Sequence, residues 1–111
     1  MRYLDQEDAL RRLGGNEVVF FSVLRKFAAG DSVAPLREAL EAGNMQEARA
    51  AAHTIKGLST NLSMPALNQA ALDLETALRE GKAVDGLPEK VYDAWHGTVL
   101  AVNEALDKSL H

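Results

Sequence analysis

Small and apolar residues recur at three- and four-residue steps from Ala48 to Leu62, and this spacing constrains the fold more than any other feature of the chain. On a helix, such residues form one narrow face that can pack closely against a neighbouring element. This face holds Ala48, Ala52, Ile55, Ser59 and Leu62. The spacing therefore predicts a helix over residues 45–62 that is buried along one side.

A second helix is predicted directly after a short connection at residues 63–65. Pro65 suits a first helical turn, and Gly81 ends the helical pattern. The buried face of this helix is expected to hold Leu67, Ala70, Ala71, Leu74 and Leu78. Two helices joined by so few residues lie antiparallel as neighbours, and counting outward from the turn places His53 level with Leu74 and Glu75.

N-cap residues and helical spacing predict shorter helices in the N-terminal part of the chain. The first lies within residues 4–13, with Asp5 as its N-cap, and ends at a pair of glycines. The next covers residues 17–27, after an Asn16 N-cap. Its β-branched and aromatic content also fits a strand, but the helical spacing of its apolar residues and the lack of a partner strand favour a helix. Part of its large apolar surface is expected to be exposed.

Two further helices complete the predicted pattern. One is capped at Asp31-Ser32, carries Pro35 in its first turn and ends at Gly43-Asn44. The last covers residues 89–110 and is the longest amphipathic element. Its buried stripe is expected to hold Val91, Trp95, Val99, Val102 and Leu106.

The composition agrees with a single all-α domain over residues 1–111. Hydrophobic residues make up 47% of the sequence, aromatic residues only 5%, and cysteine is absent, so the core must be aliphatic, without disulfides or thiolate metal sites. We expect an antiparallel four-helix bundle with one or two additional short N-terminal helices. The net charge of -4 argues against a nucleic-acid surface, and no long apolar run predicts export or a membrane span. A monomeric cytoplasmic protein is therefore expected.

His53 lies off the buried face of its helix, in a stripe that is expected to face solvent. This stripe holds Arg49, His53, Lys56, Gly57 and Thr60. Imidazole is a competent nitrogen nucleophile near neutral pH, and Lys56 is close enough to reach an anionic group attached to the ring. Gly57 costs the helix about 1 kcal/mol relative to alanine, which suggests that something approaches the backbone closely beside His53. The alternative is a solvated histidine beside an incidental glycine.

Glu75 is placed to accept the proton of one ring nitrogen of His53, which fixes the tautomer and leaves the other nitrogen free to react. It belongs to a flanking stripe of the second helix that holds Asn68, Leu72, Glu75 and Arg79. For one hand of hairpin packing the two stripes meet in a shared outer surface, and for the other they diverge. The alternative for Glu75 is a surface glutamate paired with Arg79 on the next turn.

The run AHTIKGLSTNLSMPALNQAALDLETALREG, residues 52–81, is similar to the core of a histidine-containing phosphotransfer (HPt) domain. It has H-x-x-K-G, a short hairpin turn and then Leu74-Glu75 on a helix, and residues 4–27 resemble the segment that usually precedes this core. The resemblance implies a helical bundle that carries a phosphoryl group on an exposed histidine, between aspartates of response-regulator receiver domains. It also implies that the two stripes meet. One departure is Ser63, which stands where many relatives have glycine in the hairpin turn.

The resemblance implies that His53 is phosphorylated, that Glu75 hydrogen-bonds its ring and that Lys56 is the nearest compensating cation. The partner-docking surface is expected to include Arg49, Gly57, Thr60, Leu72 and Arg79, together with apolar residues of the segment 18–27. No cofactor is expected in this chain, and Mg²⁺ is expected on the partner receiver domain. The expected partners are receiver domains, with a hybrid sensor histidine kinase as a further candidate.

Other functions stay open at this point. An amphipathic helical bundle also suits a non-catalytic interaction module in which His53 is a surface accident. Chemotaxis-type histidine kinases begin with a similar domain, phosphorylated by the kinase's own ATP site. An autonomous enzyme is not expected, because the sequence has no glycine-rich phosphate loop and no H-E-x-x-H motif. His96 and His111 are expected to be solvated.

Overall fold

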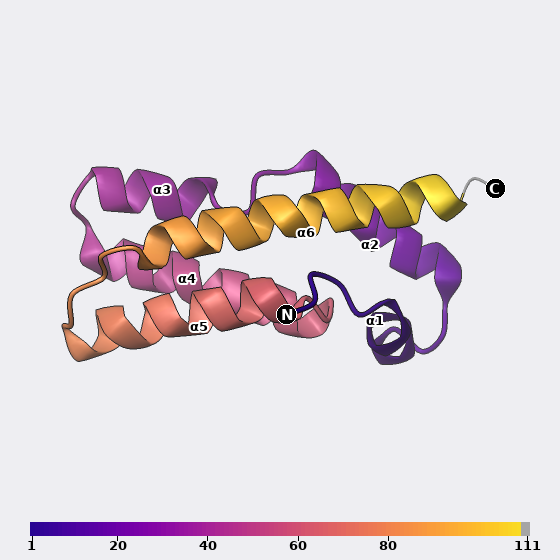
Figure 1. The fold of residues 1–111 in the computed structure, drawn as a ribbon, viewed down its shortest axis with the longest axis horizontal. Helices are drawn as coiled ribbons and strands as arrows, with labels where there is room; N and C mark the ends of the chain where they lie inside the picture. The colour runs from indigo at the N-terminus through magenta and orange to yellow at the C-terminus, as the bar shows by residue number, and fades with distance from the viewer. Residues whose placement is uncertain (110–111) are drawn as a thin grey trace.

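The computed structural model describes residues 1–109, which fold into six α-helices and no strand (Figure 1). The helices are α1 (Gln6–Arg12), α2 (Glu17–Ala29), α3 (Ala34–Glu41), α4 (Met45–Asn61), α5 (Pro65–Glu80) and α6 (Leu87–Ser109). This arrangement confirms the predicted all-helical bundle. The bundle is elongated, with principal extents of 46 × 21 × 21 Å. None of the helices in this range is long and apolar enough to cross a membrane.

Helices α4, α5 and α6 form three long sides of the bundle. Helices α4 and α5 pair as the predicted antiparallel hairpin, and α6 packs along α5. Two shorter helices share the fourth side: α3 packs against α4 at one end, and α2 packs against α6 toward the other (Figure 1). Helix α1 contacts α2 at that second end. The fourth rod of the bundle is therefore interrupted between residues 29 and 34.

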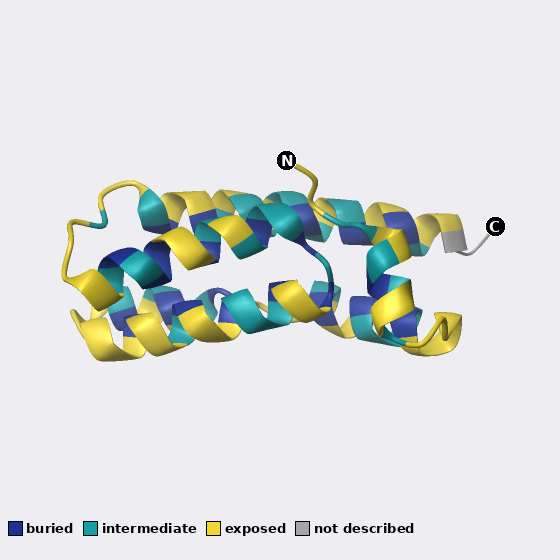
Figure 2. Cartoon of the chain, turned by 90° about the horizontal axis from the view of Figure 1, so that it is seen from below, coloured by how far each residue is buried: buried dark blue, intermediate teal, exposed yellow. Residues whose placement is uncertain are grey.

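The core is mainly aliphatic, as the composition predicted, and lies between the inner faces of the helices (Figure 2). Every residue of the predicted α4 face is buried, namely Ala48, Ala52, Ile55, Ser59 and Leu62. On α5, Ala70 and Leu78 are only half-buried, while Ala77 joins the core. In α2, Phe20 and Phe27 are buried but Val18 and Val19 are exposed, so part of the apolar surplus faces solvent as expected.

The side-chain caps confirm two of the three predicted N-terminal helix starts. Asp5 accepts a hydrogen bond from the Asp8 amide, and Asn16 accepts one from Val19. The cap predicted at Asp31-Ser32 is wrong, because the N-cap position of α3 is Val33, one residue after Ser32. Asp31 instead accepts the Val33 amide at 3.2 Å in the preceding turn.

The helix stop predicted at Gly43-Asn44 is confirmed, with Gly43 in the left-handed region after α3, whereas the start of α6 differs from the prediction. Asn44, read as a stop signal, caps α4 by accepting the Glu47 amide at 3.1 Å. Helix α6 begins at Leu87, since Pro88 occupies its first turn, where a missing amide proton costs nothing. Its predicted last residue, Leu110, lies outside the described residues.

The buried stripe of α6 is rotated relative to the predicted one. Val91 and Val102 are buried as expected, but Trp95, Val99 and Leu106 are only half-buried. Thr98 and Ala105 fill the core instead. Small side chains allow α6 to approach its neighbours closely, and the Thr98 hydroxyl is satisfied by donating to the Ala94 carbonyl at 2.6 Å. The prediction assigned only apolar residues to the buried stripe of α6, so it left out Thr98 and misplaced the stripe.

Ser63 occupies the left-handed backbone region in the α4–α5 turn, with φ of 54°. Glycine adopts this conformation without strain, which is why serine at this position was unexpected. The Ser63 hydroxyl donates to the Asp8 carboxylate of α1, and its carbonyl accepts the Asp5 amide at 2.8 Å. These contacts with the N-terminal segment offset the strain of the turn.

Candidate functional site

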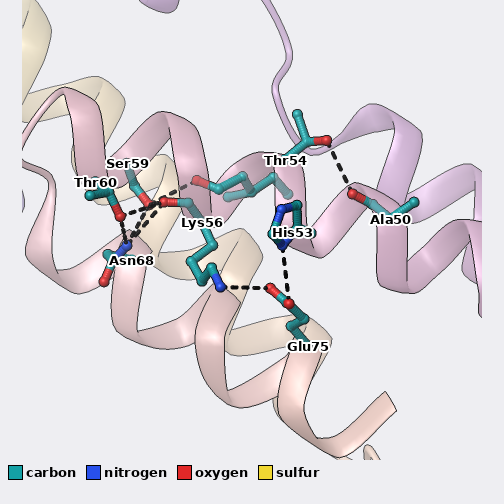
Figure 3. Close-up of polar contacts among 9 residues, drawn as sticks. Ala50, His53, Thr54, Lys56, Ser59, Thr60, Asn68 and Glu75 are labelled. Carbon is teal, nitrogen blue, oxygen red and sulfur yellow. Dashed lines mark hydrogen bonds and ion pairs between the residues drawn. The ribbon is translucent and has the colours of Figure 1, made fainter. Parts of the chain in front are cut away.

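His53 stands near the middle of α4 on its outer side. Its neighbours Ala52 and Ile55 turn into the core, which leaves 67% of the His53 side chain exposed. Its Nδ1 atom lies 3.1 Å from Oε1 of Glu75 on α5 (Figure 3). The exposed stripes of the two helices therefore meet, which is the hand of hairpin packing that the resemblance implied.

Glu75 is buried, with only 7% of its side chain exposed. The expectation that its stripe forms an outer surface is wrong for this residue, because α4 approaches closely enough for His53 and Lys56 to cover the carboxylate. The alternative pairing with Arg79 is not found, since Arg79 forms no ion pair within residues 1–109. A buried carboxylate under an exposed imidazole requires a charge partner of its own.

Lys56 supplies that partner. Its Nζ lies 3.4 Å from Glu75 Oε2, an oxygen that is enclosed and receives no well-formed hydrogen bond from residues 1–109. Burial raises the pKa of the Glu75 carboxyl, but the hydrogen bond with His53 and the Lys56 ammonium together outweigh it, so the pKa lies below its ordinary value. Glu75 is therefore ionised at neutral pH.

The ionised carboxylate decides which nitrogen of His53 can react. A carboxylate can only accept hydrogen bonds, so the proton shared with Glu75 belongs to Nδ1 of the ring. In the neutral imidazole the lone pair is then on Nε2, at the solvent side. The pair therefore presents an exposed ring nitrogen whose lone pair could act as a nucleophile, with the tautomer favoured by Glu75.

A comparison with protein families assigns the chain to a known class. The family model of the Hpt domain matches residues 28–109, which is most of the sequence. The chain belongs to the Hpt domain family. Hpt domains act in histidine phosphotransfer in phosphorelays, where they interact with receiver domains and kinases. No curated protein and no solved structure matches the chain significantly.

The two arginines predicted near the site of this Hpt domain both lie at the surface. Arg49 lines an open hollow beside His53, one turn toward the start of α4. Arg79 is exposed one turn beyond Glu75 on α5. Neither forms an ion pair with any residue between 1 and 109. Both cations are therefore available to an anionic group, whereas Lys56 already shares its charge with Glu75.

The remaining predicted docking residues flank His53 on the opposite side. Thr60 is exposed, Gly57 is half-exposed, and Leu72 is a large apolar residue that is 37% exposed. A β-carbon at position 57 would have no neighbouring atom within 4 Å apart from its chain neighbours and the adjacent backbone of α4. Packing within the described residues therefore gives no reason for glycine at this position.

Asn68 belongs to the predicted flanking stripe of α5, but the sequence indicated no role for it. Asn68 donates from Nδ2 to the Lys56 carbonyl at 3.0 Å and to Thr60 Oγ1 at 2.7 Å (Figure 3). The only sequence signal for these contacts is that Asn68 and Glu75 stand about two helical turns apart on one face. His96 is exposed as expected, and His111 lies outside the described residues. Within residues 1–109, no group of three or more acidic, histidine or cysteine side chains is arranged to hold a metal ion.

Proposed function

We propose that this Hpt domain is a phosphorelay intermediate that accepts a phosphoryl group on Nε2 of His53 from a receiver-domain aspartate. It then passes the group to an aspartate of another receiver domain. The observation that supports this most directly is the exposed His53 ring resting on a buried, ionised Glu75, with Nδ1 and Oε1 3.1 Å apart. A merely solvated histidine does not need a buried carboxylate beneath it.

In the proposed transfer, the Nε2 lone pair attacks the phosphorus of the aspartyl phosphate. The N–P bond forms as the P–O bond to the aspartate breaks, and the bonding electron pair leaves with the aspartate carboxylate. The Nδ1 proton stays on the ring, so the phosphorylated imidazole gains positive charge beside Glu75. The carboxylate stabilises this charge, because it lies within hydrogen-bonding distance before the reaction begins.

Charge compensation for the incoming phosphoryl group is proposed to come from Lys56, with Arg49 and Arg79 as weaker contributors. Lys56 Nζ lies 3.4 Å from Glu75 Oε2, so the ion pair is loose. The flexible lysine side chain can therefore also turn toward a phosphoryl group attached to the His53 ring. The Mg²⁺ that assists the reaction is proposed to sit on the receiver domain. The chain then provides the nucleophile, and the partner provides the metal.

Docking is proposed to use the surface on both sides of His53. Gly57 leaves the backbone uncovered one turn beyond the ring, and Leu72 offers an exposed apolar contact on α5. Thr60, Arg49 and Arg79 surround these positions with polar and cationic groups. This surface suits an approaching receiver whose reacting carboxylate must come into line with Nε2.

The test is incubation with a receiver domain that carries a radiolabelled aspartyl phosphate. Wild-type protein is expected to take up the label in an acid-labile, base-stable form, and to release it to a second, unlabelled receiver. His53→Gln is expected to take up none while keeping the helical circular-dichroism signal, and His96→Gln serves as the matched control. Retention of label by His53→Gln, or failure of the wild type to exchange label with receivers, would contradict the proposal and favour an interaction module.

A further inference from the structure

The carbonyl oxygen of Lys56 collects hydrogen bonds from three side chains. Thr60 Oγ1 donates to it at 2.9 Å, and Ser59 Oγ lies 3.0 Å away while sharing its one proton with the Ile55 carbonyl at 2.8 Å; both residues belong to the following turn of α4. Asn68 Nδ2 reaches the same oxygen at 3.0 Å (Figure 3). Among these three donors only Asn68 comes from α5, so it is the one that ties the two helices together.

Asn68 makes two more contacts across the same interface. Its amide nitrogen lies 2.7 Å from Thr60 Oγ1 and 3.3 Å from Ser59 Oγ. Hydrogen bonds are short-ranged and directional, so several of them to one amide define how far α5 can slide or rotate against α4. The neighbouring apolar contacts involve small residues such as Ala52 and Ala71, and apolar attraction has no preferred direction. The hydrogen bonds of Asn68 therefore add directional contacts between α4 and α5 to this apolar packing.

Lys56 connects the hydrogen bonds of Asn68 to the His53–Glu75 pair. Asn68 holds its backbone carbonyl, while Glu75 holds its ammonium group at 3.4 Å. Asn68 and Glu75 lie about two helical turns apart on the same face of α5. Their partners Thr60 and His53 have the same spacing on α4, so one helix register satisfies both sets of contacts.

We propose that Asn68 is a positioning residue that fixes the register of α5 against α4 and thereby keeps Glu75 Oε1 within hydrogen-bonding distance of His53 Nδ1. The proposal rests on the proposed role of His53 as the nucleophile. The His53–Glu75 distance is 3.1 Å, already near the upper end of the usual range for an N–H···O hydrogen bond, so a shift of α5 along α4 lengthens and misaligns this contact. The ring then loses the acceptor that holds its proton on Nδ1.

The test compares Asn68→Ala with two controls. Gln69→Ala changes the exposed neighbour on α5, whose side chain bonds only Asp73 among the described contacts. Val91→Ala removes a buried side chain of α6, so it lowers stability without touching the α4–α5 tie. For each variant we would measure the thermal midpoint, the His53 tautomer from ring ¹⁵N chemical shifts, and the transfer rate per folded molecule.

Asn68→Ala is expected to reduce the fraction of His53 in the Nδ1–H tautomer, as Glu75→Ala is also expected to do. It is also expected to slow phosphoryl transfer by roughly tenfold. Both controls are expected to keep the wild-type tautomer and rate. Because Asn68 acts through Glu75, the double variant Asn68→Ala/Glu75→Ala should transfer no more slowly than Glu75→Ala alone. These three results together would support the positioning role.

A wild-type tautomer in Asn68→Ala, with only the thermal midpoint lowered as in Val91→Ala, would overturn the proposal and leave Asn68 as a structural residue. A double variant in which the two losses add in full would overturn it as well. The tautomer measurement needs no phosphoryl transfer, so it decides the role of Asn68 even if His53→Gln shows that the proposed function is wrong.

Discussion

His53 and Glu75 form a hydrogen-bonded pair, 3.1 Å from Nδ1 to Oε1, in which the histidine side chain is 67% exposed and the glutamate side chain only 7%. The exposed member can meet a large partner, while the buried member is shielded from water and keeps its effect on the ring. The Lys56 ammonium stabilises this arrangement, because its positive charge compensates the buried Glu75 carboxylate. The geometry thus separates access to the nucleophile from control of its protonation.

Glu75→Ala is expected to slow phosphoryl transfer by roughly 10- to 100-fold, because the ring loses its orienting acceptor. Glu75→Gln keeps an acceptor oxygen of the same shape and should retain most of the tautomer preference, with an intermediate rate. The measurement is the single-turnover rate from a phosphorylated receiver. Equal rates for wild type and Glu75→Ala would contradict an orienting role.

Lys56→Ala is expected to reduce the transfer rate or shorten the lifetime of phosphohistidine, since the nearest cation is lost. It should also destabilise the fold by about 1 kcal/mol or more, because Glu75 Oε2 keeps its burial without its ion-pair partner. Lys56→Arg is the control that keeps the charge. Chemical denaturation and a phosphohistidine decay assay check the two effects separately, and a wild-type lifetime in Lys56→Ala would show that its charge does not matter for the phosphoryl group.

Gly57→Ala is expected to stabilise the domain by up to ~1 kcal/mol, since a Cβ at this position meets no neighbour and alanine is the better helix former. Gly57→Gln should fold equally well but transfer poorly from a receiver, because a long side chain obstructs the approach beside His53. The thermal midpoint and the transfer rate are measured for each variant. A destabilised Gly57→Ala with a normal rate per molecule would assign the glycine to packing rather than to docking.

Acidification is expected to remove the part of the stability that comes from Glu75. Its pKa is lower in the fold than its ordinary value of 4.5, so the ionised form stabilises the fold above that pH. This stabilisation falls as the pH drops from about 4.5 through the folded-state pKa. The free energies of unfolding of wild type and Glu75→Gln should therefore converge as the pH is lowered from 6 to 3. A difference that stays constant over this range would show that Glu75 does not titrate as described.

Ser63→Ala is expected to destabilise the domain by about 1 kcal/mol, because it loses the hydroxyl contact with Asp8 and keeps the left-handed backbone. Ser63→Gly loses the same contact but relieves the strain of the positive φ, which is worth about 1–2 kcal/mol. Ser63→Gly should therefore be the more stable of the two variants by thermal denaturation. The reverse order would show that this turn carries no conformational strain.

Local sequence determined most of the helices and singled out His53 as the candidate nucleophile. Helical periodicity and side-chain caps act over three or four residues, so Asp5, Asn16 and the buried face of α4 were predicted correctly. The same periodicity excluded His53 from the core, and the H-x-x-K-G motif pointed to its chemistry. The α3 cap and the α6 stripe were missed, because Asp31 serves a turn and Thr98 is buried with its hydroxyl already satisfied.

Tertiary structure decided what lies between the helices. The hand of the α4–α5 hairpin depends on contacts across the interface, and no periodicity within one helix specifies it, although counting outward from the turn had already placed Glu75 level with His53. These contacts bury Glu75 beneath His53, draw Lys56 toward the carboxylate and give Asn68 its three partners on α4. A separate contact, from Ser63 to Asp8 of α1, accompanies the left-handed backbone of the α4–α5 turn. The sequence thus proposed His53 as a nucleophile on an exposed stripe, whereas only the packing of α5 against α4 showed that its partner Glu75 is buried and ionised.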